Sequence, residues 1–174
     1  DRIQVNIRAL VLLTHLFIPV MKKMKTAYIL NVSSMAAFYS IAYKSLYSAT
    51  KSFVLTFSKA IQEELKDTSI KVSVVCPNGV CTNESTAKRI HAHGIKGKLL
   101  QMSPSKVARL SIVKMLKGKS VIIPGGMNKI ILFISFFISP KLTQRILSRE
   151  FKKQLAVTIN EKEKPEPLVT DNIG

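Results

Sequence analysis

The chain has 174 residues, which is enough for one domain of roughly 100 to 200 residues with a substantial core. Its hydrophobic content of 47%, with seven glycines and seven prolines, excludes a disordered or collagen-like protein. Lysine and arginine number 27 against ten acidic residues, and the net charge of +17 favours anionic partners such as phosphates, nucleic acid or a membrane surface.

Cysteine use and the first apolar stretch bear on the location of the protein. Cys76 and Cys81 lie five residues apart, and we expect free thiols in a reducing compartment. Residues 9–21 are apolar but are interrupted by Thr14, His15 and Pro19. This pattern matches neither a signal peptide nor an unbroken spanning segment of about 18 residues, so we expect a cytoplasmic protein.

The first two thirds of the chain alternate between helical and extended patterns. Apolar residues recur every three or four positions over 2–24, which predicts a helix. Residues 26–34 form a short apolar run without alternation, typical of a parallel strand covered on both faces. Helical spacing returns over 45–65, and residues 70–76 predict a second strand that ends at a Pro-Asn-Gly turn.

A third helix and strand follow. Ser103 begins a Ser-Pro-Ser sequence, which suits a capped helix start, so we predict a helix over 103–116 and a strand over 120–123. This alternation predicts an α/β fold in which helices cover a parallel sheet. Three strands are few for such a sheet, and an edge strand of this kind would expose backbone groups. We therefore expect part of the sheet to be missing from this chain.

Tyr47 and Lys51 are the first candidates for chemistry. They stand four residues apart on the predicted helix, so their side chains share one face. A nearby ammonium favours the phenolate and would lower the pKa of Tyr47 toward a value useful for proton transfer. Such pairs arise often by chance in a lysine-rich chain, so the pair needs support from other residues.

That support comes from the neighbouring elements. Ser34 lies at the carboxyl end of the first strand, where parallel sheets open onto their ligand crevice. Asn6 lies on the preceding helix, and the second strand runs into residues 76–82 at the same end of the sheet. We expect these residues to converge with Tyr47 and Lys51.

Three motifs occur in order: Asn-Val-Ser-Ser at 31–34, Tyr-Ser-Ala-Thr-Lys at 47–51, and Val-Ser-Val-Val-Cys-Pro-Asn-Gly-Val-Cys-Thr at 72–82. Together they resemble consecutive motifs of the short-chain dehydrogenase/reductase family, over residues 1–125. The resemblance implies a partial doubly wound, Rossmann-like parallel sheet with helices on both faces. It also implies an oxidoreductase that uses NAD or NADP to interconvert an alcohol and a ketone or aldehyde.

The resemblance assigns roles to individual residues. Tyr47 would be the general acid/base, Lys51 would lower its pKa and hold the nicotinamide ribose, and Ser34 would polarise the substrate carbonyl. Asn6 would hold a proton-relay water, and Ser34 and Tyr47 would bind the substrate. No metal is implied. The cofactor-binding residues would be Tyr47, Lys51, Pro77, Asn78, Val80 and Thr82.

Two features depart from the family pattern. The chain reads Pro77-Asn78 where members usually read Pro-Gly, and Asn tolerates unusual backbone angles well enough to keep the turn. No Gly-rich phosphate loop occurs in the chain, so we expect it to bind cofactor weakly on its own and to show little turnover. The alternative is a non-catalytic remnant, or a dimerising or membrane-associating module that has lost the nucleotide site.

The helices over 2–24 and 45–65 resemble the pair through which many family members dimerise. A homodimer or larger homo-oligomer is therefore expected. Its interface would include outer apolar residues of the two helices, namely Leu12, Leu16, Phe53 and Phe57.

The C-terminal part is strongly basic. No acidic residue occurs from Ser85 to Arg149, and we predict a hydrophobic and basic helical extension over 126–160 followed by a loose tail over 161–174. Within it, residues 130–138 are apolar but too few to span a bilayer. A basic helical stripe with an apolar flank then follows, formed by Lys141, Arg145, Arg149 and Lys152 beside Leu142, Ile146 and Leu147.

Two interpretations of residues 129–153 stay open. An apolar plug before a basic amphipathic helix is typical of a peripheral membrane anchor, whereas the family resemblance suggests a lid over a small apolar substrate. Nucleic acid is disfavoured, because the aromatic residues lie inside apolar runs rather than among lysines. His91 and His93 lack a third ligand at a useful spacing, so no metal site is expected.

Overall fold

The computed structural model describes residues 2–80 and 102–162, with side chains described as far as Lys152. Three parallel strands form one sheet in the order β1-β2-β3, where β1 is Ala27–Val32, β2 is Ile70–Val75 and β3 is Val121–Ile122. The predicted parallel sheet is confirmed. In the described part of the chain β1 pairs with β2 alone, which fits a sheet that lacks further strands on that side.

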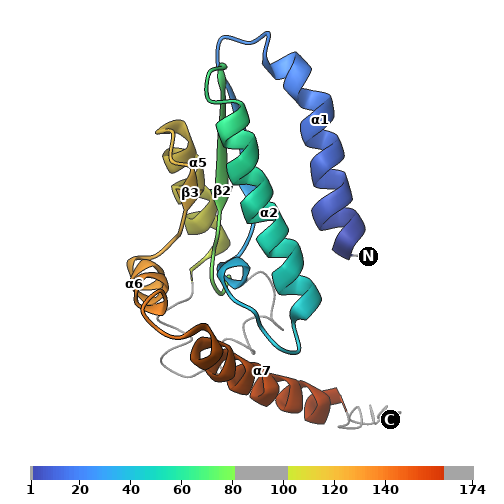
Figure 1. Cartoon of the computed structure of the whole chain (residues 1–174), viewed down its shortest axis with the longest axis vertical. Coiled ribbons are helices and arrows are strands. Elements are labelled where there is room, and N and C mark those ends of the chain that lie inside the picture. Colours follow the sequence, from blue (N-terminus) through green and yellow to red (C-terminus); the bar gives the residue numbers. More distant parts are fainter. Residues whose placement is uncertain (1, 81–101, 163–174) are drawn as a thin grey trace, which may run out of the picture.

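Helices cover both faces of this sheet. The helix α1 (Ala9–Met21), which follows a π-helical turn η1 (Gln4–Arg8), lies with α2 (Ser45–Glu64) on one side. The helix α5 (Pro104–Leu116) lies on the other side (Figure 1). Its start is as predicted, because the Ser103 hydroxyl accepts a hydrogen bond from the Lys106 amide at 3.4 Å. The predicted α/β architecture with helices on both faces is confirmed.

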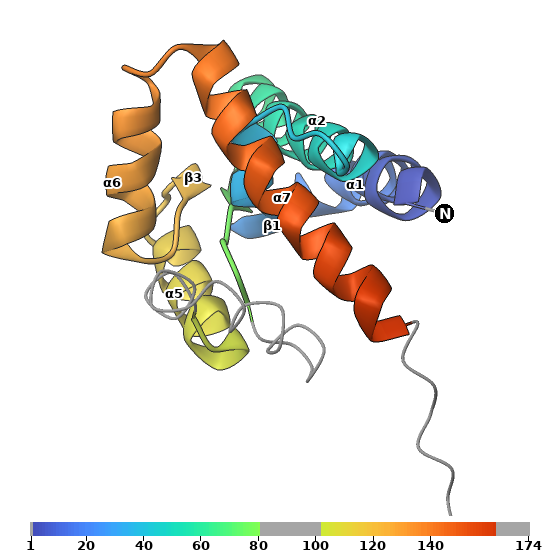
Figure 2. The same ribbon diagram turned by 90° about the horizontal axis from the view of Figure 1, so that it is seen from below.

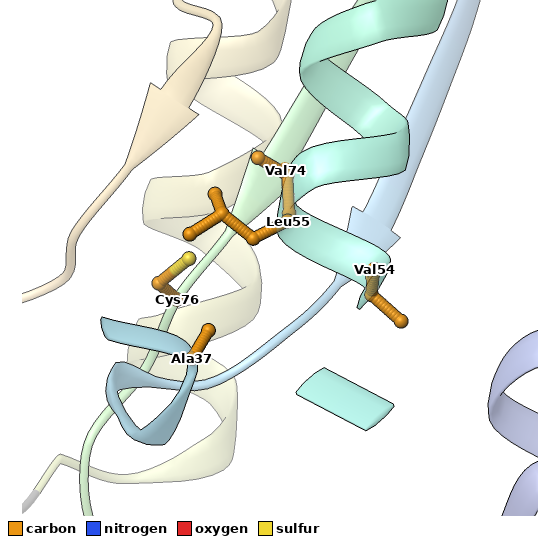
Figure 3. Packing of buried hydrophobic residues seen from close by; sticks show 5 residues of the cluster. All are labelled: Ala37, Val54, Leu55, Val74 and Cys76. Carbon is orange, nitrogen blue, oxygen red and sulfur yellow. The ribbon is translucent and has the colours of Figure 1, made fainter. Parts of the chain in front are cut away.

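The core fixes α2 against the sheet. One buried cluster joins α2 and β2 to the short 3₁₀ helix η2 (Met35–Phe38) near the carboxyl ends of the strands (Figure 3). A second cluster lies at the other end of α2, around Leu65 and Ile70. Both ends of α2 are therefore anchored by burial of apolar surface, the dominant favourable term in folding. The first cluster consists of Ala37, Val54, Leu55, Val74 and Cys76.

The N-terminal helix differs from the prediction in two ways. It ends at Met21 rather than near residue 24, with Pro19 in its last turn. The polar residues do not interrupt it, because the Thr14 hydroxyl donates to the Leu10 carbonyl at 2.7 Å within the helix. Gln4–Met21 is therefore an unbroken helical segment that could span a membrane by length and composition, a criterion that signal sequences and core helices also meet.

The C-terminal extension forms two helices at one end of the molecule. Residues Gly126–Ser135 form α6, and Pro140–Lys162 form α7. The strands run toward this end of the molecule, and α7 lies across their carboxyl ends (Figures 1 and 2). The extension is thus placed where a parallel α/β sheet opens toward ligands.

The turn into α6 gives a stability prediction. Gly125 has φ +88°, and a Cβ there would lie 3.0 Å from the Asn128 Nδ2 atom. We expect Gly125→Ala to lower the free energy of unfolding in urea by about 1–2 kcal/mol, because L-residues are strained in this region. Gly126 is the matched control: it has no such φ and nothing within 4 Å, so Gly126→Ala should leave stability nearly unchanged. Equal loss in both variants would contradict this explanation.

Candidate active site

The segments that leave β1 and β2 are held side by side by their backbones. The Ser33 amide donates to the Val75 carbonyl at 2.8 Å, and the Met35 amide donates to the Pro77 carbonyl at 2.9 Å. The two segments that carry the Ser34 and Pro77-Asn78 motifs are thereby aligned at one edge of the sheet.

Ser34 lies at the junction between β1 and η2. Its backbone is extended, and its half-buried side chain caps η2 by accepting a hydrogen bond from the Ala36 amide at 3.1 Å. This bond uses a lone pair of the hydroxyl oxygen and leaves the O–H free to donate. The arrangement is compatible with donation to a substrate carbonyl.

Lys51 joins α2 to the same edge. Its Nζ atom donates to the Val32 carbonyl at 3.0 Å, and its own backbone carbonyl accepts from the Ser33 hydroxyl at 2.7 Å. Burial lowers the pKa of the Lys51 ammonium below its ordinary value, while the nearby Cys76 thiol acts in the opposite direction. An ammonium has three N–H donors, and the bond to Val32 uses one.

Asn6 reaches α2 beside Lys51. It belongs to η1, and its Nδ2 atom lies 3.5 Å from the Thr50 hydroxyl, which donates to the Tyr47 carbonyl at 3.0 Å. The structure therefore brings the segment that contains Asn6 to the same part of α2 as the other predicted site residues.

Tyr47 is half-buried one turn before Lys51. Its ring lies under the Arg2 guanidinium, with 5.7 Å between the carbon Cζ and the ring centroid, in the range of a cation–π contact. Among the described residues, no hydrogen bond joins the Tyr47 hydroxyl to Lys51 or Ser34. The hydrogen bonds join α2 to the end of β1 and to η1, and the action of Lys51 on Tyr47 stays a prediction.

The turn after β2 is tied to α6 as well as to the segment that follows β1. The exposed Asn78 side chain donates to Asn128 Oδ1 at 3.0 Å, and Asn128 Nδ2 donates to the Pro124 carbonyl at 2.7 Å. Asn78 does not have a positive φ, so the turn forms without the unusual backbone angle that we considered for this residue. Val80 bridges to Met102, and Thr82 lies outside the described residues.

Asn128 is the residue that sequence reasoning missed. It is 2% exposed, and it connects the turn after β2 with the turn after β3. A lone amide side chain at the start of an apolar helix, just after Gly125-Gly126, was the available signal. No group of three or more metal-ligating residues occurs in the described ranges, and His91 and His93 lie outside them.

A cavity of about 510 Å³ lies between η2, the start of α2 and α7, and none of Asn6, Ser34, Tyr47 and Lys51 lines it. Residues 37–42 and four positions of the first turns of α2 line it, and Gln144 of α7 closes one side. Two further contacts attach the extension to this region: the Tyr39 hydroxyl donates to the Ser135 hydroxyl at 3.1 Å, and Lys44 Nζ lies 3.9 Å from the Phe151 ring centroid. The extension therefore packs against this region and contributes Gln144 to the lining of the cavity.

Cys76 gives a pH prediction. Burial raises the pKa of its thiol to about 11 from 9.0, although Ser33 and Lys51 oppose this effect. A raised pKa in the folded state means that the thiol contributes stability below pH 9 and loses it as pH rises toward 11. We expect the unfolding free energy of the wild type, relative to Cys76→Ala, to fall between pH 9 and 11. A difference that stays constant over this range would contradict the assignment.

Comparison with known proteins agrees with the family resemblance of the three motifs. The sequence model described as short chain dehydrogenase matches residues 1–96. Ketoacyl reductase HetN of Nostoc sp. is 30% identical over 125 residues, which are 72% of this chain and 42% of that protein. Human 17-beta-hydroxysteroid dehydrogenase type 3 is 40% identical over 80 residues, which are 46% of this chain and 26% of that protein. The chain thus spans less than half the length of these relatives.

Solved structures share the fold. A 7beta-hydroxysteroid dehydrogenase matches with a TM-score of 0.72 and 21% identity, over 83% of this chain and 56% of the other. A short chain dehydrogenase from Burkholderia cenocepacia in complex with NADP matches with a TM-score of 0.65 and 17% identity, over 82% and 57%. With the family model covering more than half of its residues, the chain belongs to the short-chain dehydrogenase/reductase family.

Proposed function

We propose that this chain is the catalytic and substrate-side part of an NAD(P)-dependent oxidoreductase that interconverts an alcohol and a ketone or aldehyde. The observation that carries the proposal is the pair of hydrogen bonds that joins Lys51 to Val32 and Ser33, directly before Ser34 at the carboxyl end of β1. Asn6 contacts the neighbouring Thr50. Family membership and the NADP complex of the Burkholderia relative support it.

The described residues fit one half of a dinucleotide. Lys51 presents a partly buried ammonium at the sheet edge, with N–H donors beyond the one that Val32 accepts, and such donors suit the hydroxyls of a ribose. Pro77 is held beside the start of η2, because its carbonyl accepts a hydrogen bond from the Met35 amide. The chain contains no Gly-rich phosphate loop, so it supplies no such site for the pyrophosphate. Bound cofactor would supply or accept the hydride.

The side chains would then handle the oxygen and its proton. Ser34 would donate its hydroxyl to the substrate oxygen, and Tyr47 would deliver or remove the proton. Lys51 would favour the ionised phenol through its charge. Asn6, held beside Thr50, would position a relay water.

We infer an apolar carbonyl or alcohol as the substrate. Apolar side chains, including Phe38 and Ile41, line the cavity at this end of the molecule together with four serines and Gln144. The names of the similar proteins, a ketoacyl reductase and a hydroxysteroid dehydrogenase, point to substrates with large apolar parts. The outer apolar face of α1 and α2 supports a homodimer: Leu12 and Leu16 are exposed, and the half-buried Phe53 and Phe57 rings stack at 5.6 Å.

The test uses the complete protein that contains this chain, with NADH or NADPH and a panel of ketosteroids and 3-ketoacyl thioesters. Tyr47→Phe removes the proton-transfer group and should reduce turnover by about 10²-fold or more, while the cofactor Kd stays nearly unchanged. Tyr43→Phe is the matched control: Tyr43 is exposed, so this variant should leave turnover nearly unchanged.

Each outcome has a defined meaning. Turnover that persists in Tyr47→Phe removes Tyr47 from the mechanism. A complete protein that binds neither cofactor would instead support the non-catalytic remnant, the alternative suggested by the missing phosphate loop.

A further inference from the structure

The helix α6 has an unusually apolar outer face. Its buried side consists of Asn128 and Leu132, and Ser135 is held by Tyr39. Apart from Gly126 and Lys129, the rest of the helix exposes large apolar side chains, and so do Phe136 and Phe137 after it, at 73% and 78%. Monomeric soluble proteins rarely leave such a continuous patch in water. The patch consists of Met127, Ile130, Ile131, Phe133, Ile134, Phe136 and Phe137.

The helix α7 has two different faces. Its inner face packs on the protein, where Gln144 lines the cavity, Leu147 is half-buried and the Phe151 ring contacts Lys44. Its outer face carries exposed Leu142 and Ile146. Beside them, spaced four, four and three residues apart, stand the exposed basic side chains of Lys141, Arg145, Arg149 and Lys152.

The two surfaces lie at the same end of the molecule. Residues 136–139 connect α6 to α7, and both helices lie at the carboxyl edge of the sheet (Figures 1 and 2). The whole stretch from Ser85 to Arg149 lacks acidic residues, and α7 contains six basic residues against two acidic ones. An apolar patch flanked by a basic stripe is complementary to a surface that combines acyl chains with anionic headgroups.

We propose that α6, the turn over 136–139 and the outer face of α7 form a peripheral binding surface for anionic lipid bilayers. The aromatic and aliphatic side chains of α6 would enter the boundary between headgroups and acyl chains, and the basic stripe would pair with the headgroups. At about 1.5 Å per residue, the ten residues of α6 reach only half of a bilayer core, so the contact is peripheral.

This proposal goes beyond the proposed function and does not require turnover. It also gives the two faces of α7 separate roles, because the inner face closes the cavity while the outer face meets the membrane. An apolar substrate dissolved in the bilayer would then lie close to the cavity. Nucleic acid is a poorer occupant, since the exposed phenylalanines form one apolar patch instead of alternating with basic residues.

The experiment is flotation of the 174-residue chain with vesicles of phosphatidylcholine, with and without phosphatidylserine, at low and high salt. We expect binding to the anionic vesicles that weakens with salt. Lys141→Glu/Arg145→Glu and Phe133→Ser/Phe137→Ser should each reduce binding. The partition constant should fall by about fivefold or more for each basic residue lost.

Matched controls separate this surface from net charge. Lys22→Glu/Lys25→Glu makes the same charge change just after α1, at the end of the molecule away from α6 and α7. Ile112→Ser/Leu116→Ser removes two exposed apolar side chains from α5. Both controls should keep most of the binding, and circular dichroism checks that every variant is folded. Equal losses in controls and test variants, or no binding at low salt, would overturn the proposal. Self-association without vesicles that Phe133→Ser/Phe137→Ser abolishes would assign the patch to a second copy instead.

Discussion

The site depends on a reciprocal connection between Lys51 and the end of β1. The Lys51 ammonium donates to the Val32 carbonyl, and the Lys51 carbonyl accepts from the Ser33 hydroxyl. The two bonds tie α2 to the end of the strand, in addition to the buried apolar clusters at both ends of the helix. The connection also sets the positions of two further residues. Tyr47 lies one turn before Lys51 on α2, and Ser34 is the residue after Ser33. The bond from Ser33 is partly buried and the bond from the Lys51 ammonium is exposed. Directional bonds favour one arrangement where apolar packing alone would permit several.

The C-terminal helices are also positioned by side-chain hydrogen bonds between distant segments. Asn128 links the turn after β2 to the turn after β3, so α6 starts from a fixed point beside the sheet edge. The helix α7 then crosses the carboxyl ends of the strands with one face against the protein (Figure 2). The wall of the cavity and the exposed apolar and basic surface are consequently opposite sides of one extension, and the lid and anchor interpretations do not exclude each other.

Much of the fold could be predicted from sequence, because local patterns determine it. Strand β2 is covered on both faces and has an almost continuous apolar sequence. Ser103 caps α5 through a hydrogen bond with Lys106, which is only three positions away. The contacts that shape the site are long-range and carry little local signal. The Lys51 side chain turns to the Val32 carbonyl, and Arg2 lies over Tyr47, since tertiary neighbours select these rotamers. Asn78 and Asn128 are 50 positions apart, so the spacing of residues along the chain could not predict their hydrogen bond.

The central claim, that Lys51 holds a nicotinamide cofactor at the edge of β1, is tested most directly by cofactor affinity. The measurement is the Kd of NADH and NADPH for the complete protein that contains this chain, in the wild type, Lys51→Met and Lys59→Met. Lys59 is exposed on the same helix and controls for the loss of one charge. A Kd raised about tenfold or more in Lys51→Met alone, the scale of one lost charged hydrogen bond, is the predicted result. The same Kd in all three proteins would contradict the account.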